Sequence, residues 1–262
     1  EAALGLRNTF NVGLGLKLQT GFEKIHSLKG TATNDNTAVT LGLEYLDNAI
    51  WKGSTRLELR TGTNSDSWLS TIAVASKLNR DWTVLGRNTY SLIKNKGLSG
   101  GANTENEQDR LQIGLAYRDT ETDVWNGLAR VEHRSERNTA DQAGVELKRT
   151  VEIASLHANW QPIRPFTFSG RYAAKWVKEQ TNGLNSRYNA QLLSGRVIWE
   201  VAPRWDASMQ ASNLSGSNGT GRQYGLGLEL GYRVLENLWL SGGYNFFGYN
   251  DADLTTGEYT NK

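Results

Sequence analysis

The sequence predicts an all-β protein, a transmembrane antiparallel up-and-down β-barrel. Three observations predict this fold class: apolar and polar residues alternate with a period of two, the connections alternate between short and long, and tryptophans lie beside the short connections. A period of two places successive side chains on opposite faces of a strand. One face of the sheet is therefore expected to be apolar and aromatic, and the other charged, small or hydroxylated.

Fourteen strands are predicted, an even number, as is usual for such barrels. A typical one has Leu111, Ile113 and Leu115 alternating with Gln112 and Gly114. Many of them reach the roughly 9–11 residues that cross a bilayer when a strand is tilted. The predicted strands span residues 2–8, 13–26, 37–46, 51–61, 67–78, 82–94, 109–118, 125–135, 147–160, 165–178, 186–200, 205–213, 222–232 and 238–249.

The composition fits long strands and argues against several other classes. The chain has 262 residues with 28 glycines, 9 tryptophans and 10 tyrosines but only 3 prolines, and proline cannot donate a hydrogen bond within a sheet. Mean hydropathy is −0.55, and no apolar run approaches the roughly 20 residues of a membrane helix. A net charge of +2 without a lysine-arginine block gives no basis for nucleic-acid binding. The absence of cysteine excludes disulfides and cysteine metal sites.

The connections between the predicted strands alternate in length. The short ones are residues 9–12, 47–50, 79–81, 119–124, 161–164, 201–204 and 234–237, and the long polar ones are residues 28–36, 62–67, 95–108, 135–143, 179–185, 215–221 and the tail from 250. Outer-membrane barrels have tight periplasmic turns and longer extracellular loops. The sequence therefore predicts a bacterial outer-membrane location, with the short turns periplasmic and the long loops extracellular.

Tryptophans mark one rim of the predicted barrel. Indole is amphipathic and settles at the headgroup level of a bilayer, which gives an aromatic girdle. Core tryptophans are the alternative, but they would not follow the positions of the turns. The predicted girdle residues, each next to a short connection, are Trp51, Trp82, Trp125, Trp160, Trp205 and Trp239.

The polar face is predicted to line a lumen in which basic residues outnumber acidic ones. Such a bias in a wet lumen favours anions over cations. The alternative is a ladder of cross-strand ion pairs, each worth about 0.2–1 kcal/mol, that lines the wall and selects little; the same residues fit both interpretations. The lumen-lining residues are Arg56, Arg60, Arg87, Arg118, Arg130, Arg171, Lys175 and Arg196 (basic) and Glu44, Glu58, Glu132 and Glu229 (acidic).

No catalytic residue, metal site or cofactor is predicted, and the chain is not expected to be an enzyme. Of the three histidines, His157 is expected to face the lumen between Ser155 and Asn159, but no nucleophile elbow or metalloprotease motif is present. The acidic tail at residues 250–258 does not have the spacing of a calcium-binding loop of the EF-hand type, and a solvated loop explains it better.

Five segments together resemble the C-terminal outer-membrane β-barrel domain of large repeat-containing bacterial surface proteins. They are LGLEY at 41–45, SLHAN at 155–159, SGRYAAKW at 169–176, RQYGLG at 222–227 and NLWLSGGYNFFGY at 237–249. The resemblance implies location and architecture, and it implies one further strand, rich in Leu, Arg and Phe, after position 262. No catalytic motif is implied.

The whole chain, residues 1–262, is thus expected to be a single outer-membrane β-barrel domain that lacks flanking strands, with a 16-strand barrel as the complete form. Both ends of the chain fall on the long-loop side, whereas such barrels normally begin and end at the periplasmic turns. The alternative to missing flanking strands is a barrel that closes from an unusual pair of ends. The expected function is to anchor or help export a surface-exposed domain; the alternative is a porin-like diffusion pore with mild anion preference. The expected partners are outer-membrane lipid and other parts of the same precursor, without nucleic acid.

Overall fold

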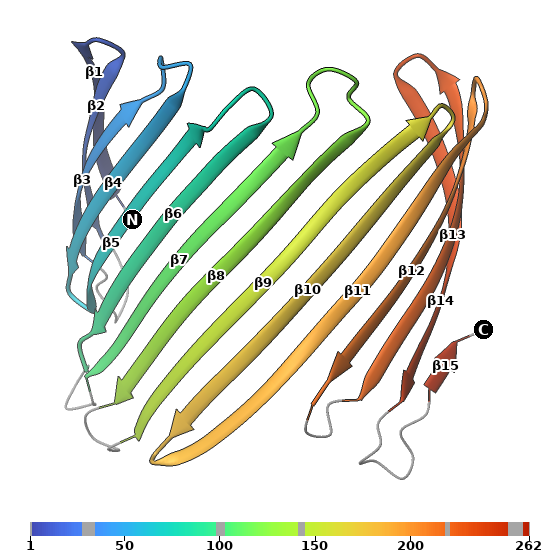
Figure 1. Ribbon diagram of the computed structural model, residues 1–262. Helices are drawn as coiled ribbons and strands as arrows, with labels where there is room; N and C mark the ends of the chain where they lie inside the picture. The colour runs from blue at the N-terminus through green and yellow to red at the C-terminus, as the bar shows by residue number, and fades with distance from the viewer. Residues whose placement is uncertain are drawn as a thin grey trace.

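The chain forms one β-sheet (Figure 1). The computed structural model describes residues 2–27, 35–97, 103–140, 145–217, 221–250 and 259–261. In these residues there are fourteen long antiparallel strands and one short one, which confirms the predicted all-β, up-and-down arrangement. The strands are β1 (Ala2–Gly13), β2 (Leu16–His26), β3 (Asn36–Tyr45), β4 (Trp51–Gly62), β5 (Ser65–Lys77), β6 (Trp82–Asn95), β7 (Thr104–Arg118), β8 (Trp125–Ala140), β9 (Val145–Ile163), β10 (Phe166–Thr181), β11 (Leu184–Ala202), β12 (Trp205–Gly216), β13 (Arg222–Leu235), β14 (Leu238–Asn250) and β15 (Tyr259–Asn261).

Each strand pairs only with the strands before and after it in the chain. Within the described residues β1 does not pair with β14 or β15, so the sheet has two free edges, and these lie at opposite sides of the view in Figure 1. The short β15 covers only residues 247–249 of the outer edge of β14. The described part of the chain contains no helix long and apolar enough to span a membrane.

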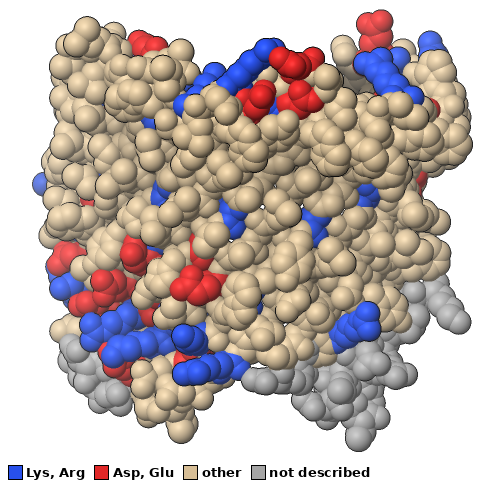
Figure 2. Space-filling view, viewed as in Figure 1, with Lys and Arg blue, Asp and Glu red and all other residues tan. Residues whose placement is uncertain are grey.

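The register separates an apolar face from a polar face. Leu115 lies directly opposite Val84 on β6 and Ala129 on β8, and residues opposite each other share a face. The sheet has a single layer, so large apolar side chains on this face stay exposed; Leu193, in the middle of β11, is 61% exposed. Figure 2 shows a face on which uncharged residues predominate across the middle, with a few basic groups visible among them, while charged groups gather at its upper rim and in its lower part. An apolar band between charged margins is what a bilayer requires.

The strands extend further on the long-loop side than the alternation predicts. β7 begins at Thr104 rather than 109, and β8 ends at Ala140 rather than 135. These extensions are polar on both faces, so they lack the apolar alternation by which strands are recognised in a sequence.

Two predicted long loops are wrong for the same reason. Residues 179–185 form a hairpin in which Thr181 pairs with Leu184. Asn182 and Gly183 have φ of 49° and 84°, the left-handed values that a two-residue turn of type I′ needs. The predicted loop at 62–67 likewise reduces to two residues between β4 and β5. Residues 28–34, 98–102, 141–144, 218–220 and 251–258, and with them the acidic tail, lie outside the described residues.

Candidate functional site on the polar face of the sheet

The register places all twelve predicted lumen residues on the same face of the sheet. One row of directly paired residues, for example, runs through Arg87, Gln112, Glu132, Ile153 and Lys175 on five consecutive strands. The sequence signal for this face, alternate positions carrying charge, is therefore consistent from strand to strand. That the face lines a lumen stays a prediction.

Ion pairs divide the eight predicted basic residues into two groups. Four are paired with carboxylates, and the other four, together with Glu44, form no side-chain hydrogen bond or ion pair with any described residue. The paired group comprises Arg56–Glu58 (2.8 Å), Arg60–Glu58 (3.4 Å), Arg118–Asp123 (3.2 Å) and Arg196–Glu229 (2.9 Å). The unpaired group comprises Arg87, Arg130, Arg171 and Lys175.

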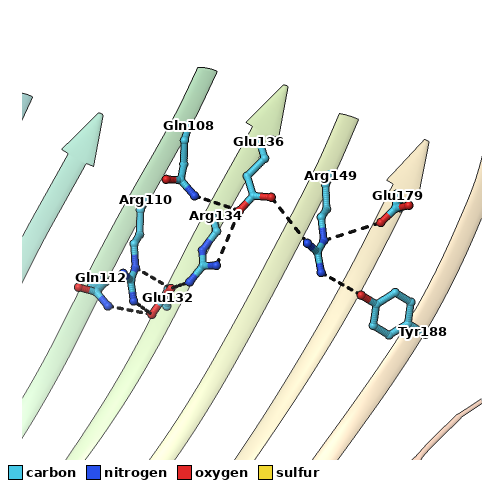
Figure 3. Close-up of polar contacts among 9 residues, drawn as sticks. All are labelled: Gln108, Arg110, Gln112, Glu132, Arg134, Glu136, Arg149, Glu179 and Tyr188. Carbon is cyan, nitrogen blue, oxygen red and sulfur yellow. Dashed lines mark hydrogen bonds and ion pairs between the residues drawn. The ribbon is translucent and has the colours of Figure 1, made fainter. Parts of the chain in front are cut away.

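Glu132 is the most buried charged side chain among the described residues and is 1% exposed. Its Oε1 lies 2.7 Å from Nε of Arg110 and 2.8 Å from Nη2 of Arg134. Its Oε2 accepts a hydrogen bond of 2.8 Å from Nε2 of Gln112 (Figure 3). Two guanidinium groups and an amide thus compensate a carboxylate that has lost its water, as a buried charge requires.

The contacts continue from Glu132 across the neighbouring strands. Nη1 of Arg134 lies 3.7 Å from Oε1 of Glu136, and Oε2 of Glu136 lies 3.8 Å from Nη1 of Arg149 (Figure 3). Arg149 donates a 3.0 Å hydrogen bond to the Tyr188 hydroxyl and lies 3.8 Å from Glu179. We call the full set the wall network: Gln108, Arg110, Gln112, Glu132, Arg134, Glu136, Arg149, Glu179 and Tyr188.

The sequence analysis named Glu132 but missed the rest of the wall network. A signal was available: Glu132, Arg134 and Glu136 alternate in charge with a period of two, so they share a face on β8. Arg110 and Gln112 have the same spacing on β7. What could not be seen in the sequence is the register between these strands, which places Gln112 directly opposite Glu132.

The wall network joins its strands through ion pairs and hydrogen bonds. Its cations and anions compensate each other across five strands and tie these strands together on one face. No group of three or more His, Asp or Glu side chains in the described ranges is arranged to hold a metal ion. The three arginines and three glutamates of the wall network make this stretch of the wall locally neutral.

Aromatic side chains line the short-turn rim on the apolar face. Tyr45 and Trp51 have ring centroids 4.4 Å apart, and Trp82 and Tyr117 have theirs 4.8 Å apart. Trp205 pairs in the same way with a tyrosine of β13, at 4.5 Å. Five of the six predicted girdle tryptophans thus share this face, which is where a girdle must lie.

Trp239 lies on the opposite face, contrary to its predicted place in the girdle. Trp239 lies directly opposite Arg233 on the polar face, in the same register that pairs Ser241 with Gly231. The Arg233 guanidinium is 5.8 Å from the centre of the indole ring, within cation–π range. Trp199, which was not predicted, instead contributes to the aromatic rim by stacking on Phe166 at 5.9 Å.

Trp160 has the largest expected effect of the rim tryptophans, because it contacts two rings. Its centroid is 5.2 Å from that of Trp125 and 5.3 Å from that of Phe168. We expect Trp160→Leu to lower the free energy of unfolding by about 1–3 kcal/mol, since each such aromatic pair contributes about 0.5–1.5 kcal/mol. Urea unfolding in lipid vesicles measures this. The control Trp239→Leu should cost less than about 1 kcal/mol; equal losses would contradict the two-ring assignment.

Two carboxylates stabilise connections between strands: Asp119 between β7 and β8, and Asp35 between β2 and β3. Asp119 accepts hydrogen bonds from the Thr122 hydroxyl and from the backbone N–H groups of Thr122 and Glu121, and these contacts lower the pKa of Asp119. Asp35 accepts a 2.8 Å hydrogen bond from the backbone N–H of Ser27, which lowers the pKa of Asp35. Because both carboxylates act in their charged form, these contacts are present at neutral pH and are lost in acid.

Solved structures of outer-membrane receptors share this fold. The ferric-catecholate import receptor Fiu of Escherichia coli matches with a TM-score of 0.67 at 10% identity, over 94% of this chain and 57% of the receptor. The alcaligin receptor FauA of Bordetella pertussis matches with 0.63 at 11% identity, over 94% and 48%. The siderophore receptor PiuA of Acinetobacter baumannii matches with 0.65 at 8% identity, over 95% and 55%.

These matches concern the fold. The chain spans about half the length of the receptors. No protein-family model and no curated protein sequence matches it. The chain therefore has the fold of an outer-membrane β-barrel wall.

Proposed function

We propose that the chain forms the larger part of the wall of a bacterial outer-membrane barrel of more than fourteen strands, whose lumen is closed by further protein. The open sheet carries this proposal: fourteen long strands pair in sequence, yet in the described residues β1 and β14 do not meet. A sheet edge in the hydrocarbon region would leave backbone groups without hydrogen bonds, so spanning barrels are closed. Further strands between β14 and β1 supply that closure.

The solved structures that share the fold favour a transport receptor over an open pore. Barrels of about 16–18 strands leave an aqueous channel, whereas outer-membrane transporters of about 22 strands have a plugged lumen. The solved structures that share the fold are described as receptors for ferric catecholates, alcaligin or siderophores. We propose that this barrel likewise admits a specific solute rather than acting as an open pore.

Two functions predicted from the sequence remain predictions. An anchoring or export role is supported by the resemblance to the repeat-containing surface proteins. A diffusion pore with anion preference now depends on Arg87, Arg130, Arg171 and Lys175, because carboxylates neutralise the other four predicted basic residues. All three functions imply contact with outer-membrane lipid, and none of them requires catalysis. We therefore propose that the chain contacts outer-membrane lipid and has no catalytic activity.

Planar-bilayer recording distinguishes these functions. The intact protein, extracted with detergent from the outer membrane of cells that produce it, should show no steady open-channel conductance. Stable ohmic steps with anion preference would establish the pore instead and overturn the proposed receptor. Recovery of the protein from the soluble fraction, monomeric without detergent, would contradict the membrane assignment itself.

A further inference from the structure

A hollow on the polar face has an apolar floor, which is unusual for a wall facing water. It lies across β4 to β8, is open on one side and has a volume of about 360 Å³. Small residues, Ala73, Ala75 and Gly114, open the space, and leucines surround it. Leu85 and Leu128 are 37% and 38% exposed there. In a lumen filled only with water the exposed parts of these leucines would remain in contact with water.

The charged groups around the hollow are all cationic. Lys52, Arg87 and Arg130 line it, and no Asp or Glu does. None of the three forms a side-chain ion pair or hydrogen bond with any residue the structure describes, in contrast with the adjoining wall network. Arg87 and Arg130 are each the sixth residue of their strand from the short-turn rim, so the cations lie in the half of the wall nearer that rim. We call this site the cationic hollow.

The shape of the cationic hollow argues against a small enclosed ligand. All its lining comes from five consecutive strands and the connection at Leu46, so the wall covers one side of an occupant only. Small-molecule sites typically bury about 70–90% of their ligand. A one-sided apolar surface with a basic rim fits a projecting part of a larger body that presents carboxylates beside apolar side chains.

We infer that the cationic hollow is the docking site, on the wall, of a polypeptide segment within the lumen that carries acidic side chains next to apolar ones. The carboxylates of the segment pair with Arg87 and Arg130, and its apolar side chains cover Leu85 and Leu128. The same contacts hold the segment against the wall. This inference rests on the proposed closed lumen and names the part of the wall that retains the closing segment.

The chain has no cysteine, so single introduced thiols report on access to the hollow. Leu85→Cys is placed on the floor, and Ser212→Cys, on the polar face of β12 outside the hollow, is the matched control. Labelling with a water-soluble maleimide is followed on the intact protein in isolated outer membranes. We expect the thiol of Leu85→Cys to react at least ten times more slowly than the control thiol. Adding Arg87→Glu and Arg130→Glu should raise its rate at least tenfold, whereas adding Arg171→Glu should not.

The outcomes separate this inference from the proposed function. Fast labelling at Leu85→Cys in a protein that shows no steady conductance would overturn the docking site and leave the closed lumen standing. Fast labelling with steady conductance would overturn both. Slow labelling that becomes fast after dialysis in detergent would assign the hollow to a small anionic ligand and overturn the polypeptide partner. Slow labelling relieved only by charge reversal at the hollow would support the inference.

Discussion

Glu132→Gln is expected to lower the free energy of unfolding by about 2–4 kcal/mol, because removing one partner of a buried ion pair leaves the other charges uncompensated. The carboxylate is 1% exposed and accepts from Arg110, Gln112 and Arg134. Glutamine keeps the shape but offers a single acceptor oxygen, and its amide turns a donor toward the guanidinium groups. Urea unfolding of the intact protein in lipid vesicles measures the loss.

The matched control for Glu132→Gln is Glu229→Gln. Glu229 is 44% exposed and pairs with one arginine, so its replacement should cost less than about 1 kcal/mol. If uncompensated charge causes the loss of stability in Glu132→Gln, adding Arg134→Gln should restore part of the free energy of unfolding. Equal losses at the two glutamates, or no recovery in the double variant, would show that the wall network does not depend on the Glu132 charge.

Leu193→Arg is expected to cost about 2–4 kcal/mol, the penalty for arginine on the lipid face of a barrel at the bilayer midplane. Leu193 is the tenth of the nineteen residues of β11, and it projects from the apolar face. Its neighbour Leu192 lies on the polar face, opposite Ala173 and Leu214. Leu192→Arg therefore introduces the same charge at the same position along β11, but on the polar face that is proposed to contact water.

The comparison of the two arginine variants tests the assignment of the faces without reference to any ligand. Leu193→Arg should reduce the amount of folded protein in the outer membrane and its resistance to urea, whereas Leu192→Arg should remain within about 1 kcal/mol of the parent protein. A larger loss for Leu192→Arg would mean that the lipid-facing and lumen-facing sides have been exchanged. Equal losses would indicate that neither face contacts lipid.

The fold could be predicted because each strand carries its own signal. Leu111, Ile113 and Leu115 mark a strand and its apolar face without knowledge of any other strand. The turn at Asn182-Gly183 was missed because its flanking strands are polar on both faces, so the lengths of β10 and β11 depend on pairing rather than on alternation.

The candidate site could be predicted only in part because it depends on register. Alternation places Arg130 and Glu132 on one face, but only the pairing of β7 with β8 shows that Glu132 has three donors and that Arg130, among the described residues, has no carboxylate partner. Trp239 shows a different limit: its place beside a short connection indicated the girdle, whereas the alternation of Leu238 and Leu240 with Trp239 and Ser241 puts it on the polar face. Closure of the sheet is a property of the whole wall and has no signature in any one strand.

Each strand pairs only with its neighbours in the chain, and this limits how such a wall can change over evolutionary time. Every hairpin holds its place through the two strands beside it, and no strand of the described chain depends on one distant in sequence. Duplication or deletion of one hairpin would therefore widen or narrow the structure by two strands and leave every other turn on its original side of the membrane. The circumference can therefore change by one hairpin at a time. The faces presented to lipid and to the interior are unchanged by such an event.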